Sequence, residues 1–141
     1  MADTIKLELV TPERQILSED VDEVIAPGVE GDLGVLPDHT PLLTALRVGE
    51  LAYRSGKRMD YVAIVGGGFL EVNNNRVIVL ADDAELGQDI NLDEAIERKL
   101  RAEKELDKER KADEKTFREA EIALMKELTR VQIAEKYKGA K

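Results

Sequence analysis

The sequence lacks cysteine and tryptophan, and only 4% of its 141 residues are aromatic. Without cysteine the chain forms no disulfide and offers no thiolate for catalysis or metal binding, which fits a reducing compartment. Hydrophobic residues still make up 43%, so a core can form, but from aliphatic side chains. No apolar run approaches the roughly 18–20 residues that a membrane span requires, and the N-terminus shows no signal-like segment. We therefore expect a soluble chain that reaches a membrane only through partners.

Groups that carry catalysis or bind metals are equally scarce. His39 is the only histidine, and a metal site needs several ligands at usable spacing. The glycines Gly66–Gly68 invite comparison with a phosphate-binding loop, but a strand pattern follows them, and the sequence has no Gly-Lys-Ser or Gly-Lys-Thr. We interpret them as a bend or a close strand crossing. The sequence therefore predicts a non-catalytic protein without a metal or cofactor.

Charge is unevenly distributed along the chain. Residues 1–86 hold seven Lys and Arg against sixteen Asp and Glu, whereas residues 87–141 hold fourteen of each, so the first part carries the whole net charge of −9. Nucleic-acid binding requires a basic patch, and this acidic part argues against it. The shift in composition near Gly87 predicts two domains, residues 1–86 and residues 87–141.

The first domain has the pattern of an all-β fold. Ile5, Leu7 and Leu9 alternate with charged residues, which places one face of a strand inward and the other outward. Further short strands are separated by turn signals, among them 55–57 (Ser-Gly-Lys) and 73–75 (Asn-Asn-Asn), which favour tight hairpins. Such strands, with a turn signal about every 8–12 residues, are typical of a β-sandwich or a flattened barrel.

The stretch Gly28–Gly49 holds four of the ten glycines and two of the four prolines. Glycine allows positive φ and close backbone approach, and proline fixes φ and removes a donor. We interpret the glycines as corners and the prolines as breaks; they are Gly28, Gly31, Gly34, Gly49, Pro37 and Pro41. Glu30 and Asp32 are expected on an exposed tip. The pattern favours a tightly folded β connection over a flexible loop.

The second domain is predicted to be helical, because no proline or glycine occurs from residue 88 to residue 138. Asn91 can cap its start, with Glu94 three residues later. Two apolar stripes run along the later part, one within Phe117–Val131 and the other within Ile122–Ile133, roughly 120° apart around the helix. The first helix can cover one stripe. The other requires a further partner, either the β domain or a different subunit.

The turn between the two expected helices has only a weak signal, a cap at Asp113 or Thr116. Nothing in the sequence forbids one continuous helix from Asn91 to Lys138, which would be roughly 70 Å long. We predict a hairpin that rests on its own sandwich and can open. The expected fold class is therefore α+β, an N-terminal β-sandwich followed by a C-terminal antiparallel two-helix hairpin.

The stretch between Gly28 and Thr44 also carries a resemblance. Its run Gly-Val-Glu-Gly-Asp-Leu-Gly-Val-Leu-Pro-Asp-His-Thr-Pro-Leu-Leu-Thr resembles the signature of the ε subunits of bacterial F-type ATP synthases. Further matches follow at Val65–Val72 and Val79–Asp82. The resemblance implies a β-sandwich and a rotor subunit that ties the γ shaft to the membrane c-ring, so that proton flow and ATP synthesis stay coupled.

The resemblance also assigns partners to particular residues. Glu30–Asp32 match the tip that faces the polar loops of the c-ring, and Asp38–Thr40 match a segment that lies against γ. Lys126 and Arg130 match the inhibitory helix. The resemblance implies that ATP hydrolysis is inhibited when this arm extends along γ into the α/β catalytic head, and relieved when it folds. It also implies a peripheral protein on the cytoplasmic face of the bacterial inner membrane.

One departure from the family concerns nucleotide. Many relatives bind ATP between the two helices through Ile/Leu-Asp-x-x-Arg-Ala, whereas Leu92–Ala95 is followed here by Ile96 and Glu97. Ile96 stands where the motif has its arginine, and Arg98 comes two residues after it. Two residues are about 200° around a helix, which argues against ATP binding. Two alternatives remain: a non-catalytic adaptor or regulator with a β head and a helical arm outside the ATP synthase, and a small-ligand β-barrel enzyme. The aliphatic strands offer the second no polar cluster.

Overall fold

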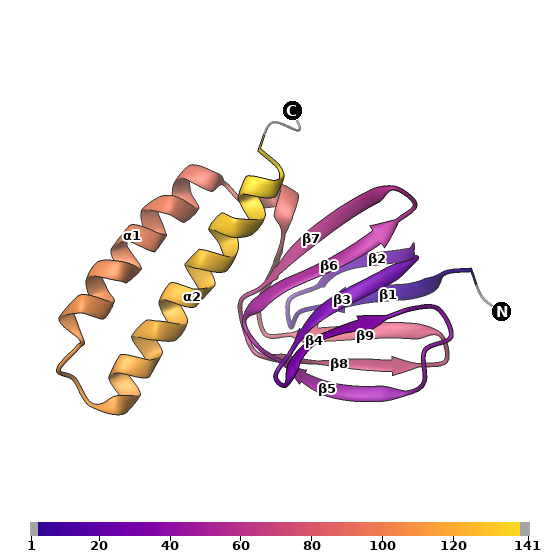
Figure 1. Ribbon diagram of the computed structural model, residues 1–141, viewed down its shortest axis with the longest axis horizontal. Coiled ribbons are helices and arrows are strands. Elements are labelled where there is room, and N and C mark those ends of the chain that lie inside the picture. Colours follow the sequence, from indigo (N-terminus) through magenta and orange to yellow (C-terminus); the bar gives the residue numbers. More distant parts are fainter. Residues whose placement is uncertain (1–2, 139–141) are drawn as a thin grey trace.

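The computed structural model describes residues 3–138, which form ten strands, one 3₁₀ helix and two α-helices (Figure 1). The strands are β1 (Ile5–Val10), β2 (Gln15–Val21), β3 (Glu23–Gly28), β4 (Gly31–Val35), β5 (Leu42–Leu46), β6 (Gly49–Ser55), β7 (Arg58–Ile64), β8 (Gly68–Asn73), β9 (Arg76–Ala81) and β10 (Ala84–Leu86). The helices are η1 (Gly87–Asp89), α1 (Leu92–Lys108) and α2 (Glu114–Lys136). The predicted α+β class, a β-sandwich followed by a two-helix hairpin, is confirmed.

The strands form one sheet that folds over on itself. Hydrogen-bonded neighbours follow the order β10-β7-β6-β3-β5-β8-β9-β1-β2, and β4 pairs with β3 beside this path. Only β1 and β9 pair in parallel among the described strands. In Figure 1, β6 and β7 lie in the upper part of the sandwich and β5, β8 and β9 in the lower part. The side chains between them form the core.

The sandwich core is aliphatic, as the sequence predicted. Ile5, Leu7 and Leu9 on alternate positions of β1 are at most 1% exposed, so the period of two is confirmed. Among the described residues of this core, Tyr53 is the only aromatic. The register between β1 and β9 places Leu9 opposite Val79, both buried, so one face of each strand points inward.

The glycine-rich stretch forms β4, β5 and the turns around them, which bears out a folded β connection. Gly31 has φ 132°, a conformation that suits glycine, and it starts β4 after the tip. The expectation for Gly34 is wrong: it lies inside β4, paired with Ile25, and makes no corner. A glycine in a strand interior is tolerated here because this part of β4 faces solvent.

The two predicted hairpin turns are present. Gly56 between β6 and β7 has φ 63°, and Asn74 and Asn75 between β8 and β9 have φ 52° and 57°. Asparagine and glycine are the residues that tolerate this left-handed backbone. The strand β10 was not predicted, because three residues are too few to show a period.

The helical arm is a hairpin and not one continuous helix. The Asn91 side chain accepts a hydrogen bond from the Glu94 N–H at 3.0 Å and caps α1, as predicted. After α1 ends, the Asp113 side chain accepts from the Thr116 N–H at 2.7 Å and caps α2. Of the two predicted caps, Asp113 is the one that the structure uses, and the hydrogen bonds from Thr116 lower the pKa of its carboxyl group.

Helix α2 lies between α1 and the sandwich (Figure 1). One predicted stripe reaches α1, with Ala120 buried and Phe117 half-buried. The second stripe is divided. Its C-terminal half reaches the sandwich, where Ile133 is 0% exposed, whereas Ile122 and Met125 farther back along the helix are 42% and 50% exposed. The sandwich is therefore the partner for only half of this stripe.

The three consecutive glycines form a close strand crossing, as predicted. A Cβ at Gly68 would overlap the carbonyl oxygen of Leu80, and one at Gly66 would lie 2.7 Å from the Asp83 nitrogen. Gly67 has more room, since a Cβ there would meet its nearest atom, a carboxylate oxygen of Asp82, at 3.9 Å. Close packing therefore accounts for the glycines at positions 66 and 68.

We expect Gly68→Ala to lower the free energy of unfolding by about 2 kcal/mol, the scale of overpacking a core. The matched variant Gly67→Ala should change it by less than about 0.5 kcal/mol, because its added methyl has space. Urea denaturation of both variants measures the difference. Equal losses in the two variants would contradict the crossing as the reason for Gly68.

Candidate functional site

Helix α2 meets the sandwich in a contact that combines apolar packing with ion pairs and hydrogen bonds, and we call this contact the seam. On the arm, its residues come from the C-terminal part of α2 and the residue that follows the helix. On the sandwich, they come from β6, from β7 and the residue after it, from β10 and from η1. They are Glu127, Arg130, Ile133, Lys136, Tyr137, Glu50, Asp60, Tyr61, Ala63, Val65, Glu85 and Gly87. The seam has a small apolar centre with polar contacts on either side.

The centre of the seam is dry and tightly packed. Ile133 is 0% exposed and packs against Ala63 and Val65 of the sandwich. A Cβ on Gly87 would overlap the Tyr137 ring and would lie 2.7 Å from Cγ2 of Ile133. Only glycine permits this approach, so Gly87 lets the end of α2 reach the sheet.

Arg130 forms the polar contact on one side of this centre. Its Nη1 lies 2.6 Å from Oε2 of Glu127 on the same helix, and its Nε lies 3.1 Å from Oε1 of Glu85 on β10. The side chain is only 14% exposed. Burial lowers the pKa of Arg130, but the hydrogen bonds and charges of Glu127 and Glu85 raise it by more. The guanidinium therefore remains charged in the seam.

Tyr137 and Lys136 form the polar contact on the other side. The Tyr137 hydroxyl accepts a hydrogen bond from the Tyr61 N–H at 2.8 Å and donates to Oδ1 of Asp60 at 3.1 Å. The rings of Tyr61 and Tyr137 meet edge to face, with centroids 6.2 Å apart. The Lys136 ammonium lies 4.2 Å from the centroid of the Tyr61 ring and 3.1 Å from Oε1 of Glu50.

The predicted tip lies at the β3–β4 turn. Glu30 and Gly31 are exposed, and so is Asp32, whose carboxylate pairs with the Arg47 guanidinium. The Val29 N–H donates to the carbonyl of Ala45 at 3.0 Å, which ties the tip to the end of β5. The tip is therefore a fixed, charged projection, as the sequence suggested.

The residues predicted to face γ lie at the opposite end of β5. Asp38 has φ 65°, and its N–H donates to Oδ1 of Asn75 at 2.8 Å, which holds the segment against the β8–β9 turn. Nδ1 of His39 lies 2.7 Å from the carbonyl oxygen of Thr40. Since a carbonyl only accepts, Nδ1 carries the hydrogen. Asp38–Thr40 and Glu30–Asp32 thus occupy two separate surfaces and form no common site.

Large apolar side chains are exposed on the outer face of the β5, β8 and β9 strands. Leu43, Phe69 and Leu80 are 68%, 56% and 52% exposed. Phe69 pairs with Leu80 across β8 and β9 and with Ala45 across β5 and β8, so the side chains share one face. We call Leu43, Ala45, Phe69 and Leu80 the apolar patch. Sequence reasoning missed it, because alternation does not say which of two faces becomes covered.

The other predicted residues lie on α2. Arg130 belongs to the seam, where the resting arm holds it against the sandwich. Lys126, one turn earlier, is half-buried and forms no ion pair within residues 3–138. Sequence reasoning missed Glu85 and Gly87 as partners of this helix, although Gly87 marked the composition boundary. It also missed Tyr137, at the end of the helix, as a contact with the sandwich.

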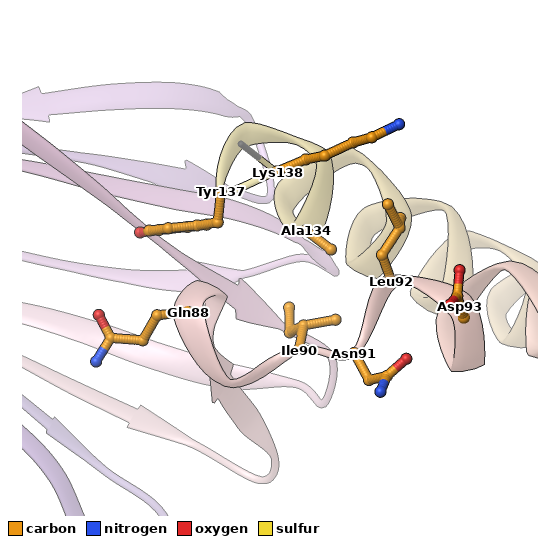
Figure 2. A pocket seen from close by; sticks show the side chains of 8 residues that line it. All are labelled: Gln88, Ile90, Asn91, Leu92, Asp93, Ala134, Tyr137 and Lys138. Atoms are coloured by element: carbon orange, nitrogen blue, oxygen red, sulfur yellow. The ribbon is translucent and has the colours of Figure 1, made fainter. Parts of the chain in front are cut away.

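A pocket of about 340 Å³ opens between η1, the first turn of α1 and the end of α2 (Figure 2). Ile90, Leu92 and Ala134 supply apolar lining, and Lys138 is the only basic residue in it. Figure 2 shows Tyr137 directed toward the strands and Lys138 directed away from them. No arginine lines the pocket, so it offers a triphosphate no bidentate partner. No group of acidic or histidine side chains within residues 3–138 could hold a metal ion.

Comparison with known proteins identifies the family. Residues 4–87 match the family described as ATP synthase, Delta/Epsilon chain, beta-sandwich domain. The chain is 47% identical over 135 residues to the ATP synthase epsilon chain of Desulforamulus reducens, across 96% of this chain and 100% of that one. It is 46% identical over 136 residues to that of Syntrophobacter fumaroxidans, across 96% and 99%. The chain belongs to the ε-subunit family of ATP synthases.

The likeness extends to a chain in a solved assembly. A chain in the cryo-EM structure of the Euglena gracilis mitochondrial ATP synthase, described as OSCP/F1/c-ring in rotational state 1, matches with a TM-score of 0.79 at 25% identity. The match covers 96% of this chain and 83% of that one. An ε subunit is a non-catalytic part of the ATP synthase. Within residues 3–138, no helix combines the length and apolarity that crossing a membrane takes.

The docked Tyr137 should ionise late. Burial is the main cause that raises the pKa of Tyr137 to about 12; the Tyr61 N–H opposes this, and the charge of Asp60 adds to it. A tyrosine released from the seam ionises near its usual value of about 10. The docked phenol is neutral, so its contribution to docking is complete below about pH 10 and is lost as the pH rises toward 12.

An ultraviolet titration of the full chain and of Tyr137→Phe checks this value. The difference between the two curves gives Tyr137 alone, and its midpoint is expected near 12. A difference curve centred near 10 would show that the Tyr137 ring does not stay in the seam.

ATP is expected not to bind this ε subunit at micromolar concentrations, because the pocket beside α1 lacks arginine and Arg130 is held by Glu127 and Glu85. Isothermal titration of the full chain with ATP should give only the heat of dilution. Saturable binding of one ATP per chain in the micromolar range would contradict this expectation.

Proposed function

We propose that this ε subunit is a rotor component of the central stalk of an F-type ATP synthase. It ties γ to the c-ring, so that proton translocation through the ring is coupled to ATP synthesis in the catalytic head. Its C-terminal helices inhibit ATP hydrolysis when they leave the sandwich. The observation that carries the proposal is the exposed apolar surface that the folded chain keeps on both its domains, residues 1–86 and 87–141.

On the sandwich, the apolar patch fits a contact with γ. Exposed apolar side chains that lie side by side are typical of protein interaction sites. Leu43 and Ala45 lie on one face of β5, the strand that follows Asp38–Thr40, so the patch and that segment are neighbours along the chain. An extended contact of this kind resists torque better than a single loop, as a rotor requires.

The tip fits a different partner. Glu30 and Asp32 are charged and exposed, and they project from the other end of β5. Such a surface suits polar loops better than an apolar helix, since charged groups lose hydration when they are buried. We assign Glu30–Asp32 to the polar loops of the c-ring. Contact with that ring places the protein, through its partners, on the cytoplasmic face of the bacterial inner membrane as a peripheral subunit.

On the arm, the uncovered half of the second stripe fits a second position of α2. Ile122 and Met125 stay 42% and 50% exposed in the folded arm, yet they continue the stripe that ends in the buried Ile133. An arm that leaves the sandwich would present the whole stripe, together with Lys126 and Arg130, to the α/β catalytic head. Cations on such a helix complement an acidic crevice. The arm is then a two-state element.

The test is ATP hydrolysis by a catalytic head that has been stripped of its ε subunit. The full chain is expected to bind through γ and to lower the rate severalfold, whereas residues 1–87 should bind and leave the rate unchanged. Binding is measured by co-sedimentation with the head. A truncated chain that inhibits as strongly as the full chain would contradict the role of the arm, and failure of both to bind would contradict the rotor assignment.

A further inference from the structure

We propose that Arg130 of α2 and Glu85 of β10 form a latch that sets how often the arm leaves the sandwich. The pair joins two modules: Nε of Arg130 lies 3.1 Å from Oε1 of Glu85, 45 residues earlier in the chain. The geometry thereby makes a sandwich residue, outside the arm and away from the apolar patch, a determinant of the arm's position.

Lys136 with Glu50 also crosses the seam, but its side chain is 34% exposed, against 14% for Arg130. The ion pairs within one helix do not join the two modules. Arg101 with Glu97 and Arg118 with Glu114 are pairs within one helix, and their side chains are 67–87% exposed. Exposed pairs of this kind contribute little and stay intact wherever the arm goes. The Arg130 side chain is 14% exposed and spans the seam, so its contact with Glu85 exists only in the folded arm.

Glu127 makes the latch reversible. It lies one turn before Arg130, and its Oε2 is 2.6 Å from Nη1 of Arg130, so it moves with the arginine when α2 leaves. Removing one partner of a buried ion pair is costly, because the other charge is left uncompensated. Here the departing Arg130 keeps the Glu127 carboxylate, so it loses only its contact with Glu85 and the weak one with Asp83 at 4.0 Å. Arg130 and Glu85 are also hydrated again when the arm opens.

The environment of Glu127 lowers the stability of the folded arm. Its side chain is 14% exposed, and its second oxygen, Oε1, is buried with no hydrogen-bond partner among the described residues. A buried unpaired oxygen costs free energy, which opening recovers. The folded position therefore rests on a balance of moderate terms, and the single contact with Glu85 is enough to shift it.

The structure provides a local reporter of arm position. The β10–β7 pairing covers Val62–Ile64 and ends there, and the N–H of Tyr61, the next position along β7, is bonded to the Tyr137 hydroxyl. Hydrogen exchange at the Tyr61 amide therefore reports whether α2 is docked. The Leu70 amide lies on β8, between Thr44 of β5 and Val79 of β9 and outside the seam, and reports the sandwich alone.

The experiment measures amide exchange in the full chain. Glu85→Gln keeps the size of the side chain and removes its charge, and Arg130→Gln removes the guanidinium. Each variant is expected to speed exchange at Tyr61 about tenfold or more, the scale of a charge-assisted hydrogen bond, and to leave Leu70 unchanged. The double variant should add little to Arg130→Gln, because the contact with Glu85 is already lost in that variant. Arg118→Gln is the matched control and should change neither amide.

Three results would overturn the latch. The Tyr61 amide could keep its native rate in Glu85→Gln, the effects of the two substitutions could add in full, or Arg118→Gln could act as strongly as Arg130→Gln. Global unfolding is distinguished from opening by Leu70, whose rate would then rise together with that of Tyr61. A joint rise in Glu85→Gln would also count against the latch.

The consequence for the enzyme rests on the proposed function. Glu85→Gln leaves α2 intact, so the full chain carrying it should inhibit the stripped catalytic head more strongly than the native chain does. Faster exchange at Tyr61 without a change in inhibition supports the latch and contradicts the inhibitory role of the arm. Stronger inhibition with native exchange at Tyr61 overturns the latch and leaves the proposed function standing.

Discussion

The structure depends on the fact that α2 has more apolar surface than its neighbours cover. One stripe of the helix packs on α1, and the C-terminal half of the other packs on the sandwich at Ile133, which is 0% exposed. The contact is possible because Gly87 has no Cβ to separate the helix from the sheet. Once Ile133 is seated, Arg130 and Tyr137 come within reach of the sandwich. The rest of the stripe remains exposed.

The two modules differ in how firmly they are held. The sandwich core contains eighteen buried side chains, whereas the apolar centre of the seam contains three. Buried apolar area scales with stabilisation, so we expect the sandwich to stay folded in the proposed open state, with opening a small event compared with unfolding. Polar contacts on both sides of Ile133 give the folded arm its orientation. Such a division fits the movable arm that we propose.

Local features of the fold were predictable, and the site was predictable only in part. The Asn73–Asn75 turn follows from a left-handed backbone that asparagine tolerates, and the cap at Asn91 from a side chain that satisfies a helix N–H. Gly34 was misjudged because a glycine in a solvent-facing strand looks like a corner in sequence. The apolar patch around Phe69 was missed, because the alternating pattern of β8 fits either face.

By itself the sequence determined the helices and the strands other than β10, the change in composition near Gly87, the presence of two stripes on α2 and the family. These follow from periodicity, turn chemistry and a long motif, which are all properties of neighbouring residues. Only the tertiary structure decided that Arg130 meets Glu85, 45 residues away, and that Tyr137 meets the Tyr61 N–H, 76 residues away. Such pairs depend on which surfaces pack together in the folded chain, and no periodic pattern in the sequence between the two residues indicates the contact.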